Sequence, residues 1–436
     1  MKELLKGIIR DFHKGSLPLV RSRFFKVPLD TGKVVTLVGV RRSGKSFLMF
    51  DTVKRLLDRG TSKERIVYVN FEDERLELHQ ESLGLILDAY SELYPEVPLS
   101  ECYLFFDEIQ NVDGWDRFVR RVYDGVTKNI FITGSNAKLL SREISTALRG
   151  RTLSYEVFPL SFGEYLSFKD VEVDLYHSGS RAKIYSAFEE FLSEGGFPEL
   201  VFISDASVRR RVLQEYFNVM LYRDIIERFG VRNVLVLKYF LKRVFEGVTS
   251  PLSINKIYNE LRSQGYKVGR DTLYTFLEAA EAVFMVLKVE RYDPSVLKRE
   301  LSAKKLYVVD NGLLNAVTVR FSKDLGKLLE NLVLVELYKK GYNSVFFYTN
   351  RGECDFVVKD DVGGREMVLQ VCWDLSYRDT MRREVEGLKR AGSRLGITSG
   401  YLITSHMEEI IVEDGFTVHV VPACKFLLQL PAAGEA

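Results

Sequence analysis

The chain has 436 residues, of which 46% are hydrophobic and 28% are charged, so it is long enough for about two to four domains with cores of their own. Its formal net charge of +2 is too small to indicate a nucleic-acid partner by itself. The four cysteines form no C-x-x-C pair, which argues against a zinc site and structural disulfides and favours a reducing compartment.

The sequence predicts neither a signal peptide nor a membrane span. Residues 1–11 carry charges throughout, and no run of about 18 apolar residues occurs in the chain. We therefore expect a soluble, cytoplasmic protein with no membrane partner.

The first chemical motif follows the apolar run 33–38, which predicts a buried strand. Residues 39–46 read G-x-x-x-x-G-K-S, and a helical pattern follows. The glycines let main-chain N–H groups face phosphates, the lysine contacts the β/γ oxygens, and the serine hydroxyl serves Mg²⁺. The motif predicts binding of a nucleoside triphosphate, with a chance match as the alternative. The predicted nucleotide-binding residues are Gly39, Val40, Arg41, Arg42, Ser43, Gly44, Lys45, Ser46 and Phe47.

The second half of such a site is an apolar strand that ends in acids, and residues 103–108 have this pattern. We expect Asp107 to serve the magnesium ion together with Ser46, and Glu108 to act as the base that orients the attacking water. The alternative is an amphipathic strand that ends in two solvated acids.

A third apolar strand, 129–133, ends in polar residues. Ser135 or Asn136 is the candidate that senses the γ-phosphate or positions water. Further on, Arg149 and Arg151 are suited to reach the γ-phosphate of a neighbouring subunit, which would make the protein a homo-oligomer. Their alternative is a pair of solvated arginines at a helix C-terminus, where the helix dipole favours them.

The periodicity predicts four segments. Apolar strands alternate with helical stretches over 1–158, the pattern of a mostly parallel α/β sheet. Residues 159–247 are helical apart from a turn at 195–198, and we interpret them as a helical lid. Residues 248–318 read as a winged helix and residues 319–436 as another α/β domain.

In the winged-helix segment, Ser253 caps a first helix through Leu261, and a second helix opens at 269–272. The strand-like runs 284–290 and 305–309 flank an expected hairpin tip. This arrangement suits a helix in a major groove with a wing on phosphate, although winged helices also dock proteins. The predicted DNA-contacting residues are Arg270, Lys298, Arg299 and Lys304.

In the last segment, an acid on a strand and a polar residue on the next strand resemble the metal site of restriction-type nucleases. Asp355 fits the first acid and Gln370 the second ligand, while Glu330 and Glu353 could add carboxylates. Cys372 stands where those enzymes carry a lysine, and Lys359 is a weak candidate for a relocated one. We therefore expect a degenerate nuclease fold that serves binding or assembly, with a slow nuclease as the alternative.

The motifs that carry a family resemblance are spread over nearly the whole chain, at 39–46, 68–73, 106–110, 132–135, 148–151, 159–166, 195–199, 328–331 and 353–356. They resemble those of prokaryotic, especially archaeal, AAA-type ATPases that carry a winged helix and a C-terminal restriction-endonuclease-like domain. The resemblance implies a P-loop, AAA+-like core with a helical lid, and ATP with Mg²⁺ as the nucleotide.

We thus expect an ATPase that couples turnover to the remodelling or processing of DNA. One alternative is a nucleotide-dependent switch that docks a protein partner. Another is a metal-dependent DNA nuclease regulated by ATP. The response of ATP turnover to DNA would discriminate between the classes.

Overall fold

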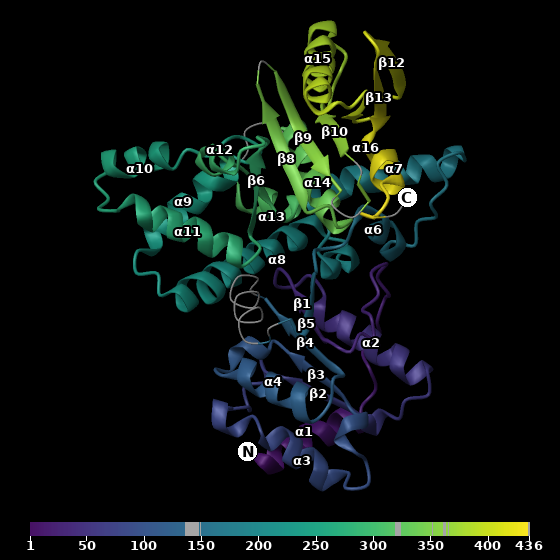
Figure 1. Ribbon diagram of the computed structural model, residues 1–436, viewed down its shortest axis with the longest axis vertical. Coiled ribbons are helices and arrows are strands. Elements are labelled where there is room, and N and C mark those ends of the chain that lie inside the picture. Colours follow the sequence, from purple (N-terminus) through teal and green to yellow (C-terminus); the bar gives the residue numbers. More distant parts are fainter. Residues whose placement is uncertain are drawn as a thin grey trace. The chain divides into compact units, whose positions relative to one another are not determined.

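The computed structural model describes residues 1–135, 148, 150–318, 324–350, 352–360, 363–364 and 366–434. They form two compact units, Met1–Phe158 with Ala282–Phe284, and Pro159–Glu281 with Met285–Ala436. Figure 1 follows the chain from the purple and blue elements of the first unit to the yellow C-terminal end. Across the described ranges, no helix combines the length and apolar character that crossing a membrane requires.

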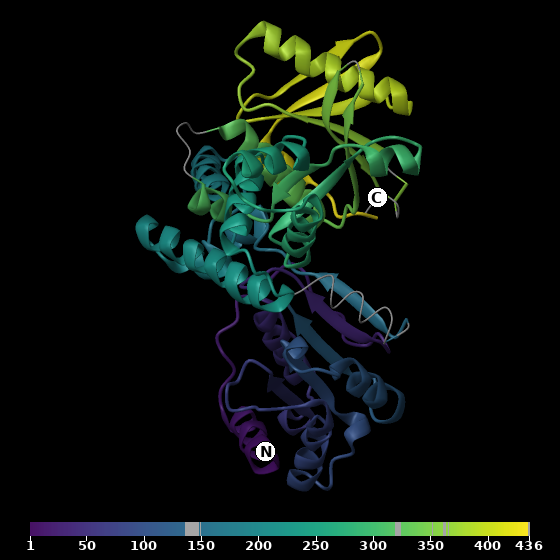
Figure 2. The same cartoon turned by 90° about the vertical axis from the view of Figure 1, so that its left-hand side faces the viewer.

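The first unit is built on a parallel sheet, as the alternating pattern predicted. Its strands lie in the order β2-β3-β4-β1-β5, and every neighbouring pair is parallel. Figure 2 shows these strands side by side. Strands β1 and β4 are buried at every residue, which explains their continuous apolar runs. The strands are β1 (Val34–Val38), β2 (Ile66–Asn70), β3 (Tyr103–Asp107), β4 (Ile130–Gly134) and β5 (Thr152–Glu156).

Amphipathic helices complete the core of this unit. Leu48 and Val53 of helix α2 belong to the buried cluster that contains Phe105 and Phe131, whose rings stack with centroids 4.7 Å apart. The helices of the unit are α1 (Lys2–Lys14), α2 (Lys45–Asp58), α3 (Leu85–Leu93) and α4 (Trp115–Gly125), with short 3-10 turns η1 (Lys63–Arg65), η2 (Gln80–Ser82), η3 (Leu99–Glu101) and η4 (Ile109–Asn111).

The second unit begins with the helices that the sequence predicted. The breaker cluster at 195–198 separates α7 from η6, and Asp205 caps α8 by accepting hydrogen bonds from the N–H groups of Ser207 and Val208. These elements are α6 (Phe162–Phe168), α7 (Ser178–Glu194), η6 (Pro198–Phe202), α8 (Ala206–Val219), η7 (Met220–Glu227) and α9 (Val234–Glu246).

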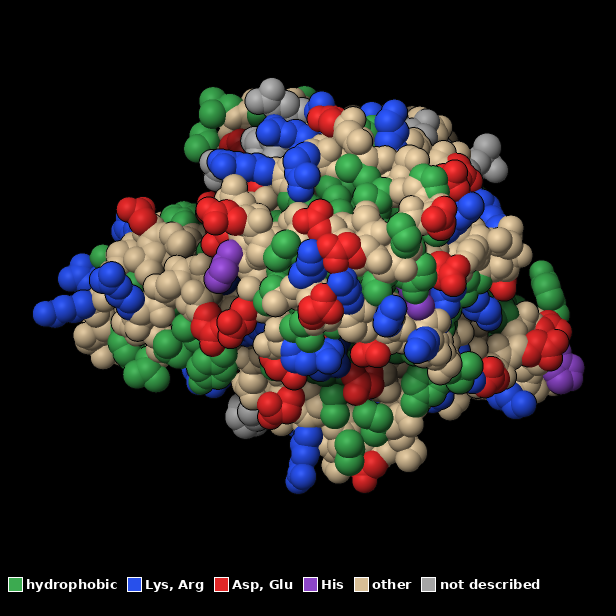
Figure 3. All heavy atoms as spheres, turned by 90° about the horizontal axis from the view of Figure 1, so that it is seen from below, with side chains coloured by type: hydrophobic (Ala, Val, Ile, Leu, Met, Phe, Trp, Pro, Cys, Tyr) green, Lys and Arg blue, Asp and Glu red, His purple; other side chains and the backbone are tan. Residues whose placement is uncertain are grey.

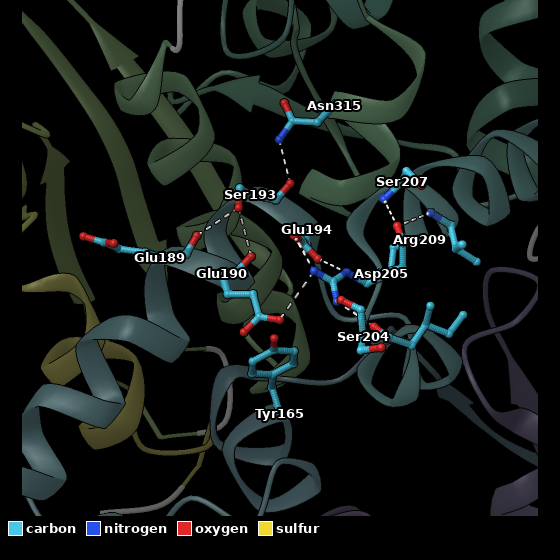
Figure 4. A network of polar contacts seen from close by, with 12 residues as sticks. Tyr165, Glu189, Glu190, Ser193, Glu194, Ser204, Asp205, Ser207, Arg209 and Asn315 are labelled. Carbon is cyan, nitrogen blue, oxygen red and sulfur yellow. Dashed lines mark hydrogen bonds and ion pairs between the residues drawn. The ribbon is translucent and has the colours of Figure 1, made fainter.

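An internal ion pair joins two of these helices. The guanidinium of Arg209 in α8 lies against Glu190 and Glu194 of α7, and it also donates to the main-chain oxygens of Ile203 and Ser204 (Figure 4). Its side chain is only 13% exposed. Arg209 therefore fixes the packing of α7 and α8.

The next segment contains the two predicted helices, α10 (Ile254–Ser263) and α11 (Arg270–Ala282). Ser253 caps α10 by accepting a hydrogen bond from the N–H of Lys256, as expected. The predicted hairpin tip is wrong, because helix α12 (Val296–Leu301) lies between β6 (Val286–Arg291) and β7 (Lys305–Val308).

The strand pair expected as a wing belongs to the C-terminal sheet. Strand β6 pairs antiparallel with β7 and parallel with β8, giving an eight-stranded sheet in the order β12-β13-β11-β10-β9-β8-β6-β7. Its other strands are β8 (Ser344–Thr349), β9 (Glu353–Lys359), β10 (Glu366–Val371), β11 (Ser399–Thr404), β12 (Glu409–Glu413) and β13 (Phe416–Pro422), and its helices are α13 (Asn311–Val317), α14 (Leu325–Lys339), α15 (Arg378–Leu395) and α16 (Ala423–Gln429).

A buried polar junction links the three predicted segments of the second unit. The carboxylate of Asp310 accepts a hydrogen bond of 2.7 Å from the N–H of Gly196, in the breaker cluster after α7. A Cβ at Gly195 would lie 2.0 Å from Asp310, so no side chain fits there. The amide of Asn331 in α14 bonds both the N–H and the carbonyl of Val308 in β7. The segments interlock through these contacts.

Candidate nucleotide-binding site

Two glycines with positive φ shape the loop between β1 and α2. Gly39 has φ of +154°, and a Cβ there would lie 2.1 Å from the carbonyl oxygen of Val157. Gly44 has φ of 97° and precedes α2, whose first turn has no side-chain cap. Within the described residues, the buried Oγ of Ser43 has no hydrogen-bond partner. The loop and the first turn of α2 thus present polar groups suited to an anion.

Lys45 is buried in this loop, with 4% of its side chain exposed. Its Nζ donates to the carbonyl oxygens of Gly39 at 3.1 Å and Val40 at 3.2 Å. The same ammonium lies 3.5 Å from Oε1 of Glu108. Lys45 therefore connects the loop after β1 with the acid that follows β3.

Asp107 ends β3 with both carboxylate oxygens engaged. Thr133 donates to Oδ1, and Tyr68 donates to Oδ2 at 2.7 Å. Burial raises the pKa of Asp107, although hydrogen bonds from Thr133, Tyr68 and Ser46 oppose this shift. The contact with Ser46 brings together the hydroxyl and the carboxylate that the sequence assigned to magnesium.

Glu108 is held in an uncommon backbone conformation, with φ of 52°. Its N–H donates to Thr133 Oγ1 at 2.8 Å, and its Oε2 accepts from Gln110 at 2.5 Å. Burial opposes the charged form, but the ammonium of Lys45 and the amide of Gln110 outweigh it and hold the pKa of Glu108 below its ordinary value. Glu108 is therefore an ionised carboxylate at neutral pH, as an acceptor of a proton from water must be.

Of the remaining predicted residues of this site, one lies near Glu108, one pairs elsewhere and two are not described. Ser135 is buried, 3.5 Å from the amide nitrogen of Gln110, and so belongs to the network around Glu108. Asn136 and Arg149 lie outside the described residues. Arg151 donates to Asp124 of its own chain at 2.8 Å.

Among the other loop residues, Arg41 is largely buried, with 13% of its side chain exposed, whereas Arg42 and Phe47 are exposed. Arg41 pairs with Glu72 at 2.7 Å, Arg42 has φ of 69°, and the Phe47 ring is 51% exposed. Sequence reasoning missed the central role of Thr133, whose hydroxyl serves both Asp107 and Glu108. A polar residue in an otherwise apolar strand was the available signal.

The residues predicted for the nuclease-like site also meet, with one addition. Glu330, Glu353 and Asp355 surround Lys305, a residue that the sequence had not indicated. Lys359, the weak candidate for a relocated lysine, pairs instead with Glu366 at 2.5 Å. Burial raises the pKa of the Cys372 thiol to about 11, so this side chain carries no charge at neutral pH.

Gln370, the predicted second ligand, lies between Asp355 and Glu384. Gln370 accepts a hydrogen bond from the N–H of Asp355 at 3.0 Å and donates to Glu384 at 2.6 Å. Both ends of the Gln370 amide are therefore engaged within the chain.

The predicted DNA-contacting residues differ in whether they form ion pairs with acidic side chains of the chain. Arg270 is exposed at the start of α11, with its guanidinium 4.9 Å from the ring centre of Tyr258. Lys298 is exposed on α12, whereas Lys304 pairs with Glu290 at 3.0 Å and Arg299 lies 4.0 Å from the same carboxylate. Lys and Arg side chains gather at the left end of Figure 3, the side on which α10 lies in Figure 1.

Comparisons with known proteins agree with the description of the first unit. Residues 31–166 match the AAA domain, and residues 185–324 match a domain of unknown function, DUF8612. The uncharacterized protein MJ1544 of Methanocaldococcus jannaschii is 36% identical over 423 residues, which cover 94% of this chain and 91% of that protein. An uncharacterized protein of Haemophilus influenzae is 32% identical over 389 residues, which cover 88% and 93%.

Among solved structures, the AMPPCP-bound DnaA from Aquifex aeolicus has a TM-score of 0.26 and 12% sequence identity to this chain. The matched part covers 64% of this chain and 87% of that chain. At this TM-score the likeness carries no argument about function.

Proposed function

This chain belongs to the family of these uncharacterized archaeal and bacterial proteins and carries an AAA domain, and from that premise we propose that it binds and hydrolyses ATP with Mg²⁺. The position of Lys45 is the observation that carries the proposal. Its ammonium lies between the carbonyls of the glycine loop and the carboxylate of Glu108. A cation held by neutral oxygens and one carboxylate can exchange these partners for phosphate oxygens.

The residues of the loop fit a magnesium nucleotide. The unpartnered Oγ of Ser43 and the uncapped first turn of α2 offer polar groups to an anion. Ser46 and Asp107, which share a hydrogen bond, would hold the magnesium ion. The bound nucleotide would supply the phosphoanhydride bond, and Lys45 would bind its β/γ oxygens.

Glu108 supplies the base in this proposal. Its lowered pKa keeps the carboxylate ionised, so Glu108 can orient a water molecule and serve as the acceptor of its proton. The bonds from the Glu108 N–H to Thr133 and from Gln110 to the carboxylate fix its position. When phosphate binds Lys45, the ion pair with Glu108 weakens, which frees the carboxylate to face water.

Nucleotide binding and turnover by the full chain test the proposal. Wild-type protein should bind a fluorescent ATP analogue and release phosphate, and Lys45→Ala should lose both. Lys54→Ala, which removes a lysine from the exposed face of the same helix, is the matched control and should behave as wild type. A Lys45→Ala protein that hydrolyses ATP at the wild-type rate would exclude this site.

A second candidate function is binding of DNA by the helices α10 and α11. The observation that favours it is the exposed group formed by Arg262 and Arg270, whose guanidinium carbons lie 5.8 and 4.9 Å from the ring centre of Tyr258. Tyr274, 53% exposed, lies on the same helix as Arg270. Basic side chains stacked on aromatic rings suit both phosphates and unstacked bases.

ATP turnover with and without single-stranded, duplex and branched DNA tests this candidate. Stimulation by DNA that disappears in Arg262→Ala/Arg270→Ala would support it. If none of the three DNAs changes the rate of ATP turnover and none shows salt-dependent binding to the protein, a protein partner for this surface is favoured.

A further inference from the structure

Three carboxylates from two elements of the C-terminal sheet region converge on one lysine. Nζ of Lys305 in β7 lies 3.0 Å from Oε1 of Glu353, 3.2 Å from Oε1 of Glu330 and 3.5 Å from Oδ1 of Asp355. The lysine side chain is 2% exposed, and only Glu353 has a largely exposed side chain, at 57%. The ammonium therefore occupies the centre of the cluster.

The other polar groups around the cluster are also engaged within the protein. Tyr307 donates to the same oxygen of Glu330 at 2.8 Å, and the N–H of Val371 donates to Oδ2 of Asp355 at 3.0 Å. Gln370, the predicted second ligand, directs its oxygen to the main chain of Asp355. The sequence-based ligand set is thus satisfied by internal donors.

These residues do not fit a divalent cation as they are arranged. A magnesium or calcium ion needs several oxygens at about 2.0–2.6 Å, and the ammonium of Lys305 lies among the oxygens that would have to supply them. A metal ion bound to these oxygens and the buried ammonium of Lys305 would repel each other strongly. A metal could enter only if Lys305 left.

We propose that Lys305 is the resident cation of this carboxylate cluster, where it ties β7 to α14 and β9 and excludes divalent metal. This inference concerns the C-terminal sheet and is independent of the proposed ATP site. It assigns the nuclease-like carboxylates a structural role, because the group that neutralises them is part of the chain.

The electrostatics of the cluster agree with a permanently charged lysine. Burial opposes the charge of Lys305, but Glu330, Asp355 and Glu353 outweigh it and raise its pKa above the ordinary value. Burial also raises the pKa of Glu330 and of Asp355. Without the ammonium, these carboxylates would lose the main interaction that stabilises their charge.

Thermal unfolding of the full chain without nucleotide tests the structural half of the proposal. Lys305→Met keeps the apolar stem and removes the charge, and it should lower Tm by roughly 6–20 °C, since breaking a buried ion pair is strongly destabilising. Lys359→Met is the matched control, because the ion pair of this lysine with Glu366 joins two side chains that are each about one-third exposed, and its Tm should stay near that of wild type. Equal Tm values for Lys305→Met and wild type would overturn the proposal.

Added MnCl₂ tests the exclusion of metal. Any shift of Tm by Mn²⁺ should be the same in wild type and in Asp355→Asn, because the cluster takes no metal. In Lys305→Met, Mn²⁺ should restore part of the lost Tm, and Lys305→Met/Asp355→Asn should lose this response.

Two outcomes of these metal experiments contradict the proposal. The first is stabilisation of wild type by Mn²⁺ that vanishes in Asp355→Asn, a comparison that holds even where Lys305→Met does not fold. The second is metal-dependent DNA cleavage by wild type that requires both Asp355 and Lys305, which would make the lysine part of an active nuclease site.

Discussion

Lys45 and Lys305 are both buried beside carboxylates, yet their surroundings differ in what the ammonium can exchange. Lys45 lies 3.5 Å from one carboxylate, that of Glu108, and otherwise bonds two main-chain carbonyls. Lys305 lies within 3.5 Å of three carboxylates. If phosphate replaces the partners of Lys45, only one carboxylate loses its cation. If a ligand replaced the partners of Lys305, three carboxylates would lose theirs.

The two lysines also differ in whether the surrounding backbone favours an incoming anion. Lys45 opens a helix after a glycine loop, so N–H groups and the helix dipole favour an incoming anion. Lys305 is the first residue of the edge strand β7, which residues 249–252 cover by pairing with it. A buried lysine beside acids therefore indicates catalysis only where the backbone also offers a place for the substrate.

The largest expected effect concerns Glu108. Glu108→Gln should lower ATP turnover on the order of 10²–10⁴-fold while nucleotide affinity stays near that of wild type, because the amide cannot accept a proton from water. Steady-state phosphate release and titration with a fluorescent nucleotide measure the two quantities. Glu101→Gln, at the last residue of η3 just before β3, is the control. Undiminished turnover in Glu108→Gln would remove the proposed base.

The next effect concerns the pH dependence of the Lys305 cluster. The folded-state pKa values of Glu330 and Asp355 are raised, so the stability linked to them is present below their unfolded pKa and is lost as pH rises through the folded pKa. Lys305→Met should raise these folded pKa values further. The free energy of unfolding of Lys305→Met should therefore fall further below that of wild type as pH rises from 5 to 8. This deficit should grow by up to about 1.4 kcal/mol per pH unit for each proton involved.

Urea unfolding of Lys305→Met and wild type at pH 5, 6.5 and 8 measures this deficit. Lys359→Met should follow wild type at each pH. A deficit that is constant over this range would mean that loss of packing, and not unpaired carboxylates, explains the variant.

A smaller effect is expected at Thr133. Thr133→Val removes the hydroxyl that donates to Asp107 and accepts from the N–H of Glu108, so both groups lose a partner in a buried site. The variant should lose about 1–3 kcal/mol of unfolding free energy and some turnover. Thr36→Val is the control, because the hydrogen-bond partner of its hydroxyl in the described part of the chain is Thr152, which also donates to the carbonyl of Val34. Equal stabilities of the two variants would show that the hydrogen bonds of Thr133 are dispensable.

The smallest effect distinguishes free from paired basic residues. If DNA binds α10 and α11, Arg270→Ala should reduce the slope of log affinity against log salt by about 0.9, whereas Lys304→Ala should change it little, because Lys304 already pairs with Glu290. Fluorescence anisotropy at several salt concentrations measures the slopes. The reverse order would return the DNA contact to the wing that the sequence suggested.

The elements of the first unit could be predicted because their signals are local. The glycine loop, the strand that ends in Asp107 and Glu108, and the apolar runs of β1 to β4 are each contained in fewer than about ten consecutive residues. The role of Thr133 could not be predicted in this way, since its partners follow a different strand. Only the alignment of β3 with β4 in the sheet brings them together.

The errors in the second unit arise from pairing over long stretches of sequence. The runs that became β6 and β7 look like a hairpin, and no local pattern shows that β6 also pairs with β8, as it does at Arg291 and Phe347. Lys305 was missed for the same reason, because Glu330 and Asp355 follow it by 25 and 50 residues. The carboxylates were found because acids on helices and strands form a pattern that a single lysine does not.

The pairing of β6 with β8 also has a consequence for synthesis on the ribosome. Arg291 leaves the ribosome well before its partner Phe347, and at about 5–20 residues per second the interval is on the order of 3–11 s. Until β8 has emerged, β6 presents one unpaired strand edge, and Lys305 lacks Glu353 and Asp355, which follow Phe347 in the chain. The nascent chain therefore passes through a period in which β6 can pair with other chains, and crowded polysomes or a slow codon stretch between these strands would lengthen it.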